Sequence, residues 1–158
     1  LYRRAVCEAV GQWSAKRIFE DWDYDCRAGL LGIKLHYCGE SIALVRRNIG
    51  DHAGLAWQRD AAAMQARIHA YAAVLDYARQ AGIAKESHEM QHFVRSLFWM
   101  AREAGAYGFA GESQELFRLA SEHTVKQGWD FRLYGMATRV LGWKRTGRLA
   151  AAIDRWWK

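Results

Sequence analysis

The chain has 158 residues, of which 51% are hydrophobic and 13% aromatic, and this composition excludes an intrinsically disordered protein. Its formal net charge of +6 leaves nucleic acid, anionic lipid and phosphorylated small molecules open as partners. No apolar run approaches the roughly 20 residues that a membrane-spanning helix needs. The sequence contains no proline, which removes the commonest helix breaker and favours a mainly helical fold.

The start of the chain and its cysteines indicate a cellular compartment. The opening LYRRAVCEAV has no apolar signal-peptide core and no initiator methionine, so we expect part of a longer, cytoplasmic protein. Cys7, Cys26 and Cys38 form no Cys-x-x-Cys pair and are expected to stay reduced. With His36 they would supply four zinc ligands, but their spacing matches no usual pattern, and we expect no zinc site.

The first third of the sequence predicts short elements separated by glycines. A helix over residues 3–10 is expected to end at Gly11, and a second helix over residues 21–31 at Gly32. The segment IKLHYCGESIALVRR predicts two short strands, residues 33–37 and 42–46. A glycine-containing loop, NIGDHAG, follows.

From about Leu55 onward the sequence predicts helices only. The first ends at Gly82, the second is capped by Ser87 and ends at Gly105, the third covers residues 112–126, and two more lie on either side of Gly142. The expected inward-facing residues are Met64, Ile68, Tyr71, Leu75, Ala78, Phe93, Leu97, Ala101, Leu116, Phe117, Leu119 and Ala120.

Two parts are therefore predicted in a mainly α fold. Residues 1–56 are expected to form a small α/β unit, and residues 57–158 an all-helical bundle or an array of helical hairpins. The hairpin over residues 93–120 is similar to a helical-repeat unit, but a single copy without a clear period leaves a true repeat array as the less favoured alternative.

The stretch FEDWDYDCR, residues 19–27, places Glu20, Asp21, Asp23 and Asp25 close together in an otherwise basic chain. Acids in the first turn of a helix are stabilised by its exposed amides and dipole, which accounts for one or two carboxylates but hardly for four. Asp23 and Arg27 are four residues apart and are expected to pair on one helix face. The remaining acids require another explanation, such as a metal or a substrate.

Three segments of residues 1–56 together resemble the closing third of a family-2 glycosyltransferase catalytic domain of the GT-A fold. They are LYRRAVCEAVGQW, FEDWDYDCRAGLLGIKLHYC and SIALVRRNIGDHAGL. In that family a helix carrying Arg-Arg leads to a Gly-x-aromatic turn, a Glu-Asp pair then starts a helix, and a later Val-Arg…His segment closes the site. An isolated Glu-Asp pair is weak evidence, but these elements in one order are fairly specific.

The resemblance implies an inverting sugar transfer with Asp21 as general base. Glu20 would orient the acceptor or the base, and Trp22 would stack on an acceptor sugar unless it is simply packed. Arg46 or Arg47 would contact phosphate oxygens of the donor, with a solvated strand end as the alternative.

His52 would bind a divalent metal, Mg²⁺ or Mn²⁺, or the donor's diphosphate, against a surface or capping role. The implied partners are a nucleotide-sugar donor and a saccharide or lipid-linked acceptor. The family's nucleotide-binding half, with its Asp-x-Asp metal motif, is not among these 158 residues, so we expect the fragment alone to be inactive.

The end of the chain, GWKRTGRLAAAIDRWWK, has two interpretations. Leu149, Ile153 and Trp156 share one face of a helix that also carries arginines, which fits a helix on the anionic inner face of the cell membrane. The slightly favoured alternative is that the helix packs on its neighbours while the arginines are solvated.

Two further functions stay open: a non-catalytic helical interaction module, and a nucleic-acid-binding domain. Nucleic acid is not expected, because the basic residues are scattered until the last twenty positions.

Overall fold

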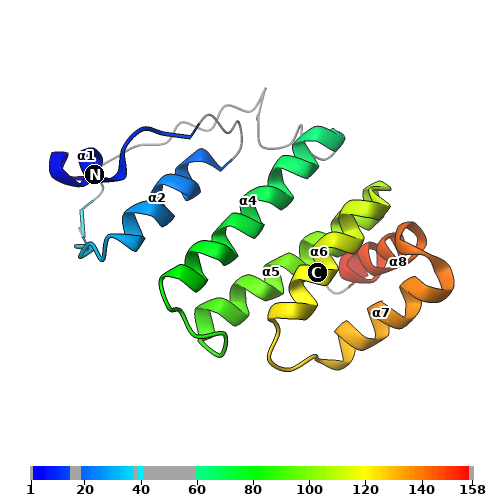
Figure 1. The fold of residues 1–158 in the computed structure, drawn as a ribbon. Coiled ribbons are helices and arrows are strands. Elements are labelled where there is room, and N and C mark those ends of the chain that lie inside the picture. The colour runs from blue at the N-terminus through cyan, green and yellow to red at the C-terminus, as the bar shows by residue number, and fades with distance from the viewer. Residues whose placement is uncertain (1, 15–18, 38, 41–59, 157–158) are drawn as a thin grey trace.

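A computed structural model describes residues 2–14, 19–37, 39–40 and 60–156, and this part of the chain is helical, without a strand (Figure 1). The mainly α prediction is confirmed. The helices are α1 Arg4–Val10, α2 Glu20–Leu30, α4 Ala61–Gln80, α5 His88–Tyr107, α6 Ala110–His123, α7 Trp129–Leu141 and α8 Trp143–Trp156. None of the described helices is long and apolar enough to cross a bilayer.

The predicted α/β character of the first part is not supported. Residues 33–37 form no strand, and the second predicted strand, residues 42–46, lies outside the described residues. A strand is stabilised by a paired neighbour and by one buried face. Of the three residues that would have formed its apolar face, Ile33 is half-buried, whereas Leu35 and Tyr37 are 85% and 89% exposed.

The cap at Ser87 was predicted and the cap at Asp60 was not; the helix predicted over residues 112–126 is α6, which ends at His123. Asp60 and Ser87 cap α4 and α5, because their side-chain oxygens accept from the backbone amides of Ala62 and Met90. The predicted end of α5 at Gly105 is wrong: α5 continues to Tyr107 and ends at Gly108, which has a φ of 96°.

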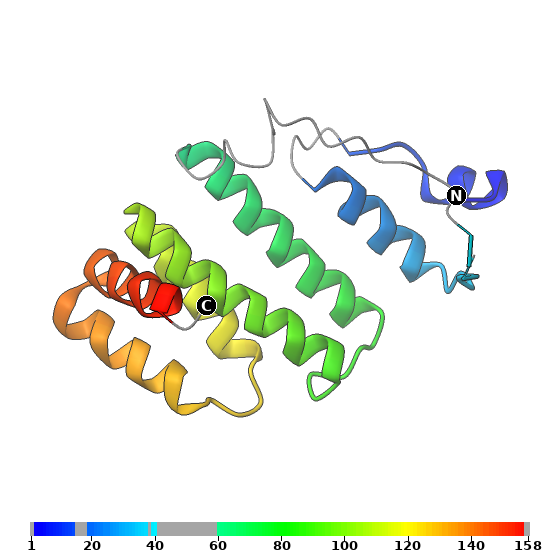
Figure 2. The same cartoon turned by 180° about the vertical axis from the view of Figure 1, so that it is seen from behind.

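The hydrophobic core is centred on α5, which packs against both α6 and α8 (Figure 2). Phe98 of α5 is fully buried, and its ring stacks on that of Phe131 in α7 with the centroids 4.0 Å apart. The predicted inward-facing residues are buried or pack against this core. On the other side of the bundle α4 packs against α2, which joins the two predicted parts of the chain.

Glycine allows α5 and α8 to approach each other closely. A Cβ added at Gly105 would lie 2.7 Å from the carbonyl oxygen of Trp143, which explains why a glycine occurs inside α5. A Cβ added at Gly147 would lie 2.5 Å from the carbonyl carbon of Gly105 and 2.8 Å from the carbonyl oxygen of Arg102. Since these neighbours are backbone atoms, they cannot move aside without separating the helices.

The contact of α8 with α5 uses small residues and not the apolar ones that the sequence indicated. Thr146, Gly147 and Ala150 face α5 and are buried, whereas Leu149 and Ile153 are exposed. The contact agrees with the packing interpretation of this helix, which named no residues for it.

Substituting Gly147 tests this contact. We expect Gly147→Ala to lower the free energy of unfolding by about 1–3 kcal/mol, because the added methyl group overlaps the backbone of α5. Urea unfolding followed by circular dichroism measures this change. Gly29→Ala in α2 is the matched control: its Cβ meets nothing within 4 Å, so it should be neutral or stabilise by up to about 1 kcal/mol. Equal stability of Gly147→Ala and the unsubstituted chain would contradict the close contact.

Candidate active site

The acidic cluster lies at the beginning of α2. Phe19, directly before the helix, has a φ of 60° and is the single described residue other than glycine with a positive φ. This left-handed conformation costs about 1–2 kcal/mol in a non-glycine residue, so other contacts must offset it. The Phe19 ring supplies them, because it packs against Trp22 at 4.6 Å and edge-on against Tyr71 of α4 at 5.8 Å.

The carboxylates of the cluster divide into two pairs, and the first pair has structural partners. Asp23 is buried, accepts from Arg27 Nε at 3.1 Å as the i, i+4 spacing predicted, and also accepts from the Tyr77 hydroxyl at 2.9 Å. Asp25 accepts from the Tyr2 hydroxyl at 2.6 Å. Burial and the bond to Asp23 raise the pKa of Tyr77, and the bond to Asp25 raises the pKa of Tyr2 to about 12.

The second pair, Glu20 and Asp21, has no such partners. Asp21 is exposed, and among the described residues its Oδ1 accepts from the backbone amide of Trp22 alone, at 2.9 Å. Within the described part of the chain neither carboxylate forms an ion pair. The predicted base and its neighbour are therefore adjacent in the first turn of α2, and the side chain of Asp21 faces solvent.

Trp22 is mainly a packed residue. Besides Phe19, its ring contacts Tyr71 with the centroids 5.5 Å apart, and 36% of the residue is exposed. Of the two sequence interpretations, packing therefore accounts for most of the ring.

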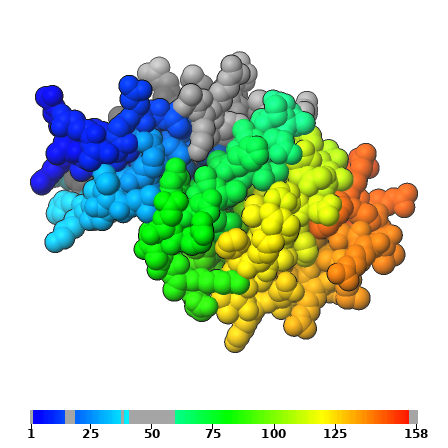
Figure 3. Space-filling view, viewed as in Figure 1, coloured from blue at the N-terminus to red at the C-terminus, as the bar shows by residue number. Residues whose placement is uncertain are grey.

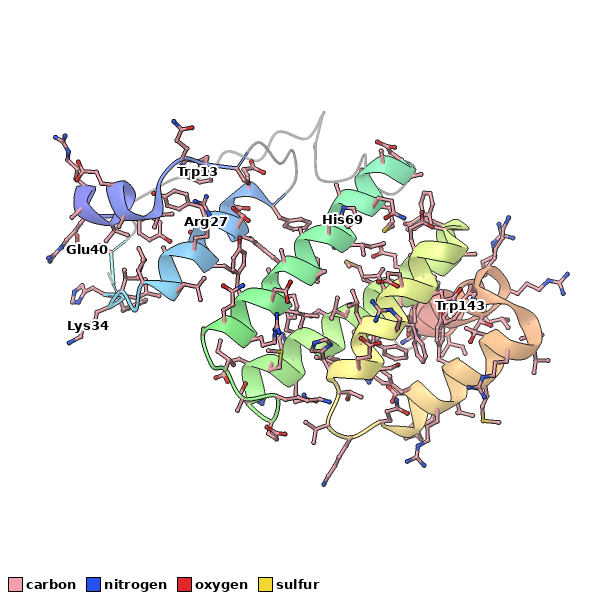
Figure 4. The ribbon with its side chains drawn as sticks, in the orientation of Figure 1. Trp13, Arg27, Lys34, Glu40, His69 and Trp143 are labelled. Atoms are coloured by element: carbon pink, nitrogen blue, oxygen red, sulfur yellow. The ribbon has the colours of Figure 1, made fainter. Side chains whose placement is uncertain are left out.

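Arg27 holds the preceding loop against α2 (Figure 4). In addition to Asp23, its guanidinium donates to the carbonyl oxygens of Val10 at 2.7 Å and Gln12 at 2.8 Å. Trp13, beyond this turn, stacks on the ring of Tyr24 with the centroids 4.7 Å apart. The Gly-x-aromatic turn and the acidic helix are thus joined by one arginine and one aromatic pair.

The other predicted site residues cannot be placed. Arg46, Arg47 and His52 lie outside the described residues, as does Cys38 of the zinc alternative. Over the part of the chain that the structure describes, no group of three or more His, Cys, Asp or Glu side chains could hold a metal ion. The described residues therefore do not form a site for the divalent metal, and Glu20 and Asp21 alone do not make one.

Sequence reasoning missed two residues that shape the site. Tyr77 reaches Asp23 from α4 across 54 positions of sequence, and no local pattern indicates such a contact. The left-handed Phe19 was also missed, because the usual residues for that conformation are glycine and asparagine. The one feature of the sequence that could have drawn attention to Phe19 is its position directly before the acidic residues that begin α2.

A groove of about 760 Å³ lies between α6 and α7. Its floor includes Phe117 and Trp143, and Arg118 on its wall pairs with Glu115 and Glu122, each at 2.6 Å. None of the predicted site residues lines it. The acidic start of α2 and this groove are therefore separate candidates for binding.

Comparisons with protein-family models, with curated proteins and with solved structures found no match for this chain. The resemblance to family-2 glycosyltransferases therefore depends on the motifs of residues 1–56 alone.

Substituting Arg27 tests the architecture of the site. We expect Arg27→Met to destabilise the chain by about 2 kcal/mol, because it removes charge-assisted bonds to two carbonyls and leaves buried Asp23 without this partner. The matched control is Arg79→Met, since Arg79 is 79% exposed and pairs only with exposed Asp76; its effect should stay below about 0.5 kcal/mol. Thermal unfolding measures both, and equal losses would contradict the assigned role of Arg27.

Proposed function

We propose that this chain is part of an inverting glycosyltransferase in which Asp21 is the general base. The observation that carries the proposal is the division of the acidic cluster. Asp23 and Asp25 are engaged by Arg27, Tyr77 and Tyr2, whereas Asp21 is exposed and free of ion pairs among the described residues. A base must be able to meet an incoming substrate, and of these aspartates Asp21 is the one whose carboxylate bonds to no side chain among the described residues.

The chemistry is a direct displacement at the anomeric carbon of a nucleotide-sugar. The acceptor hydroxyl has a pKa well above 7 and is a poor nucleophile, so a carboxylate within hydrogen-bond distance must take its proton as the new bond forms. Asp21 would take this proton, and the nucleoside diphosphate would leave from the opposite face of the sugar. Glu20, the preceding residue, would orient the acceptor hydroxyl, and the exposed edge of Trp22 would lie against the acceptor ring.

The surrounding contacts would keep the base in position. Arg27 fixes α2 against the preceding turn, and Asp23 ties the same helix to Tyr77 of α4. Because both anchors lie within two turns of Asp21, small motions of the helix start are restrained. The rest of the machinery is proposed from the resemblance: Arg46 and Arg47 for donor phosphates, and His52 for a divalent metal, which would stabilise the leaving diphosphate.

The proposed partners are a nucleotide-sugar donor and a saccharide or lipid-linked acceptor, and the proposed location is the cytoplasm. Transfer would also require a nucleotide-binding half with an Asp-x-Asp motif. The test therefore uses the enzyme in which this chain is joined to such a half.

Replacing the base tests the proposal. In that enzyme, Asp21→Asn should lower kcat by about 10²–10⁴-fold while the donor dissociation constant stays unchanged, because the amide cannot accept the acceptor's proton. Initial rates of nucleoside diphosphate release measure the effect. Asp25→Asn in the same helix is the matched control and should change kcat by no more than a few-fold. If Asp21→Asn retains the full rate, Asp21 is not the base.

A non-catalytic interaction module is the second candidate, and the groove between α6 and α7 is the observation that favours it. In that case the acidic start of α2 would only cap a bundle, and Asp21→Asn would leave every activity of the protein unchanged. Filling the groove with Ser121→Trp would instead be the damaging change, because Ser121 lines it.

A further inference from the structure

The positive charge of this protein is concentrated at one end. Residues 129–158 contain seven Lys and Arg against two Asp and Glu, so they carry +5 of the chain's formal charge of +6. Within them α7 and α8 lie at the end of the molecule opposite α1, as Figures 1 and 3 show. The remainder of the chain is nearly neutral.

The two acids of this segment do not offset the exposed charge, because both face the core. Asp130 of α7 pairs with Arg95 of α5, and Asp154 of α8 pairs with Arg102 of α5 at 2.7 Å. The outward surface of α7 and α8 keeps four exposed arginines that form no ion pair with any described residue: Arg132, Arg139, Arg145 and Arg148. The arginines of α5 thus neutralise Asp130 and Asp154, and the exposed charged residues described on α7 and α8 are all basic.

An apolar stripe follows the exposed face of α7. Trp129, Leu133, Met136 and Val140 are spaced i, i+4, i+7 and i+11 and are 77%, 54%, 62% and 83% exposed. At 100° per residue, Arg132 and Arg139 both lie along the same edge of this stripe. The opposite face of α7 is the one that packs on α5, through Phe131 and Tyr134.

Helix α8 also carries exposed apolar residues beside arginines, with fewer apolar residues than α7. Leu149 and Ile153 of α8 are 54% and 57% exposed, and Arg145 and Arg148 lie beside them on the helix surface. Apolar side chains bordered by arginines, with a tryptophan among them, are typical of helices that lie in the headgroup region of a bilayer.

We propose that the outer face of α7, together with that of α8, docks on a bilayer containing anionic phospholipid. Leu133, Met136 and Val140 enter the boundary between headgroups and acyl chains, and Trp129 lies at the interface. Arg132 and Arg139 contact lipid phosphates along one edge. This inference does not depend on the proposed sugar transfer.

The positive charge on the outer face of α7 and α8 favours a bilayer over the other possible binding partners of this face. A second copy of the chain would bring one row of arginines against another, and like charges at an interface oppose association. A single-stranded nucleic acid would need aromatic rings for its bases, whereas three of the four residues of the stripe are aliphatic or thioether side chains. A bilayer supplies the negative charge and the apolar layer together.

Flotation with lipid vesicles tests the proposal on the 158-residue chain. We expect binding to mixed phosphatidylcholine–phosphatidylserine vesicles, weakening with salt, and little binding to phosphatidylcholine alone. Arg132→Glu with Arg139→Glu should lower the partition coefficient at least about tenfold, and so should Leu133→Asp with Val140→Asp. Because all four positions are exposed, circular dichroism should show these variants folded.

Two control variants carry the same changes at the other end of the molecule. Arg3→Glu with Lys34→Glu changes the net charge equally, and Leu35→Asp with Tyr37→Asp replaces two apolar residues that are also exposed. Both should bind vesicles within about twofold of the unsubstituted chain, since the described contact lies on α7 and α8. Equal losses in the controls would show that net charge alone attracts the protein, and would overturn the proposal.

Four other results would overturn it as well. The first is that the unsubstituted chain does not bind vesicles, and the second is that Leu133→Asp with Val140→Asp binds them undiminished, which would mean adsorption without insertion. The third is a dimer in solution that Leu133→Asp with Val140→Asp abolishes, while vesicles do not bind. The fourth is a steeply salt-dependent affinity for an oligonucleotide in place of vesicle binding.

Discussion

The buried carboxylate of Asp23 is the constraint on which the first half of the structure depends. A carboxylate removed from water is costly unless charges and donors surround it, and here Arg27 and Tyr77 do so from two directions. Arg27 also binds the turn after α1, and Tyr77 belongs to α4. Through these two partners the side chain of Asp23 connects α2 with that turn and with α4. The acidic stretch thus begins a helix and anchors it to the helical part, and two of its acids form no ion pair with a described residue.

The contacts of Asp23 and Asp25 explain part of the cluster of four acids in residues 19–27 of this basic chain. Asp23 and Asp25 are structural, because their partners hold α2 to α4 and to the N-terminal segment. Among the described residues, Glu20 and Asp21 gain the favourable field of the helix start, which is weak at an exposed site, and Asp21 also accepts from the Trp22 amide. The described contacts therefore give Asp23 and Asp25 a structural role, and the role of Glu20 and Asp21 in sugar transfer stays a proposal.

Much of the fold could be predicted from the sequence, because helix ends depend on local chemistry. Ser87 and Gly142 mark boundaries through their own side chain or backbone, and the i, i+4 pair of Asp23 and Arg27 follows from helix geometry. The predicted helix end at Gly105 is wrong for the opposite reason: the backbone of another helix, and not a turn, requires a glycine there. A glycine that admits a distant neighbour and one that ends a helix look alike in sequence.

The site and the surface were harder to predict. The carbonyl oxygens that Arg27 binds carry no sequence signal, and Tyr77 is brought to α2 only by tertiary packing. On α7 the stripe that begins with Trp129 has the same period as a buried face, so periodicity alone cannot show which face is covered. Predicting a strand at residues 33–37 failed because a short alternation of apolar and polar residues does not specify whether a partner strand is present.

The close contact between Gly105 and Gly147 also bears on the order of folding. α5 and α6 are adjacent in sequence, and their contact between Ser113 and Ala101 spans 12 positions, whereas the contact of Arg102 with Ala150 spans 48. Closing the longer loop costs more chain entropy, so the α5–α6 hairpin should form before α8 arrives. The last helix to dock would then be the first to detach, and the lifetime of the native state would be governed by two glycines.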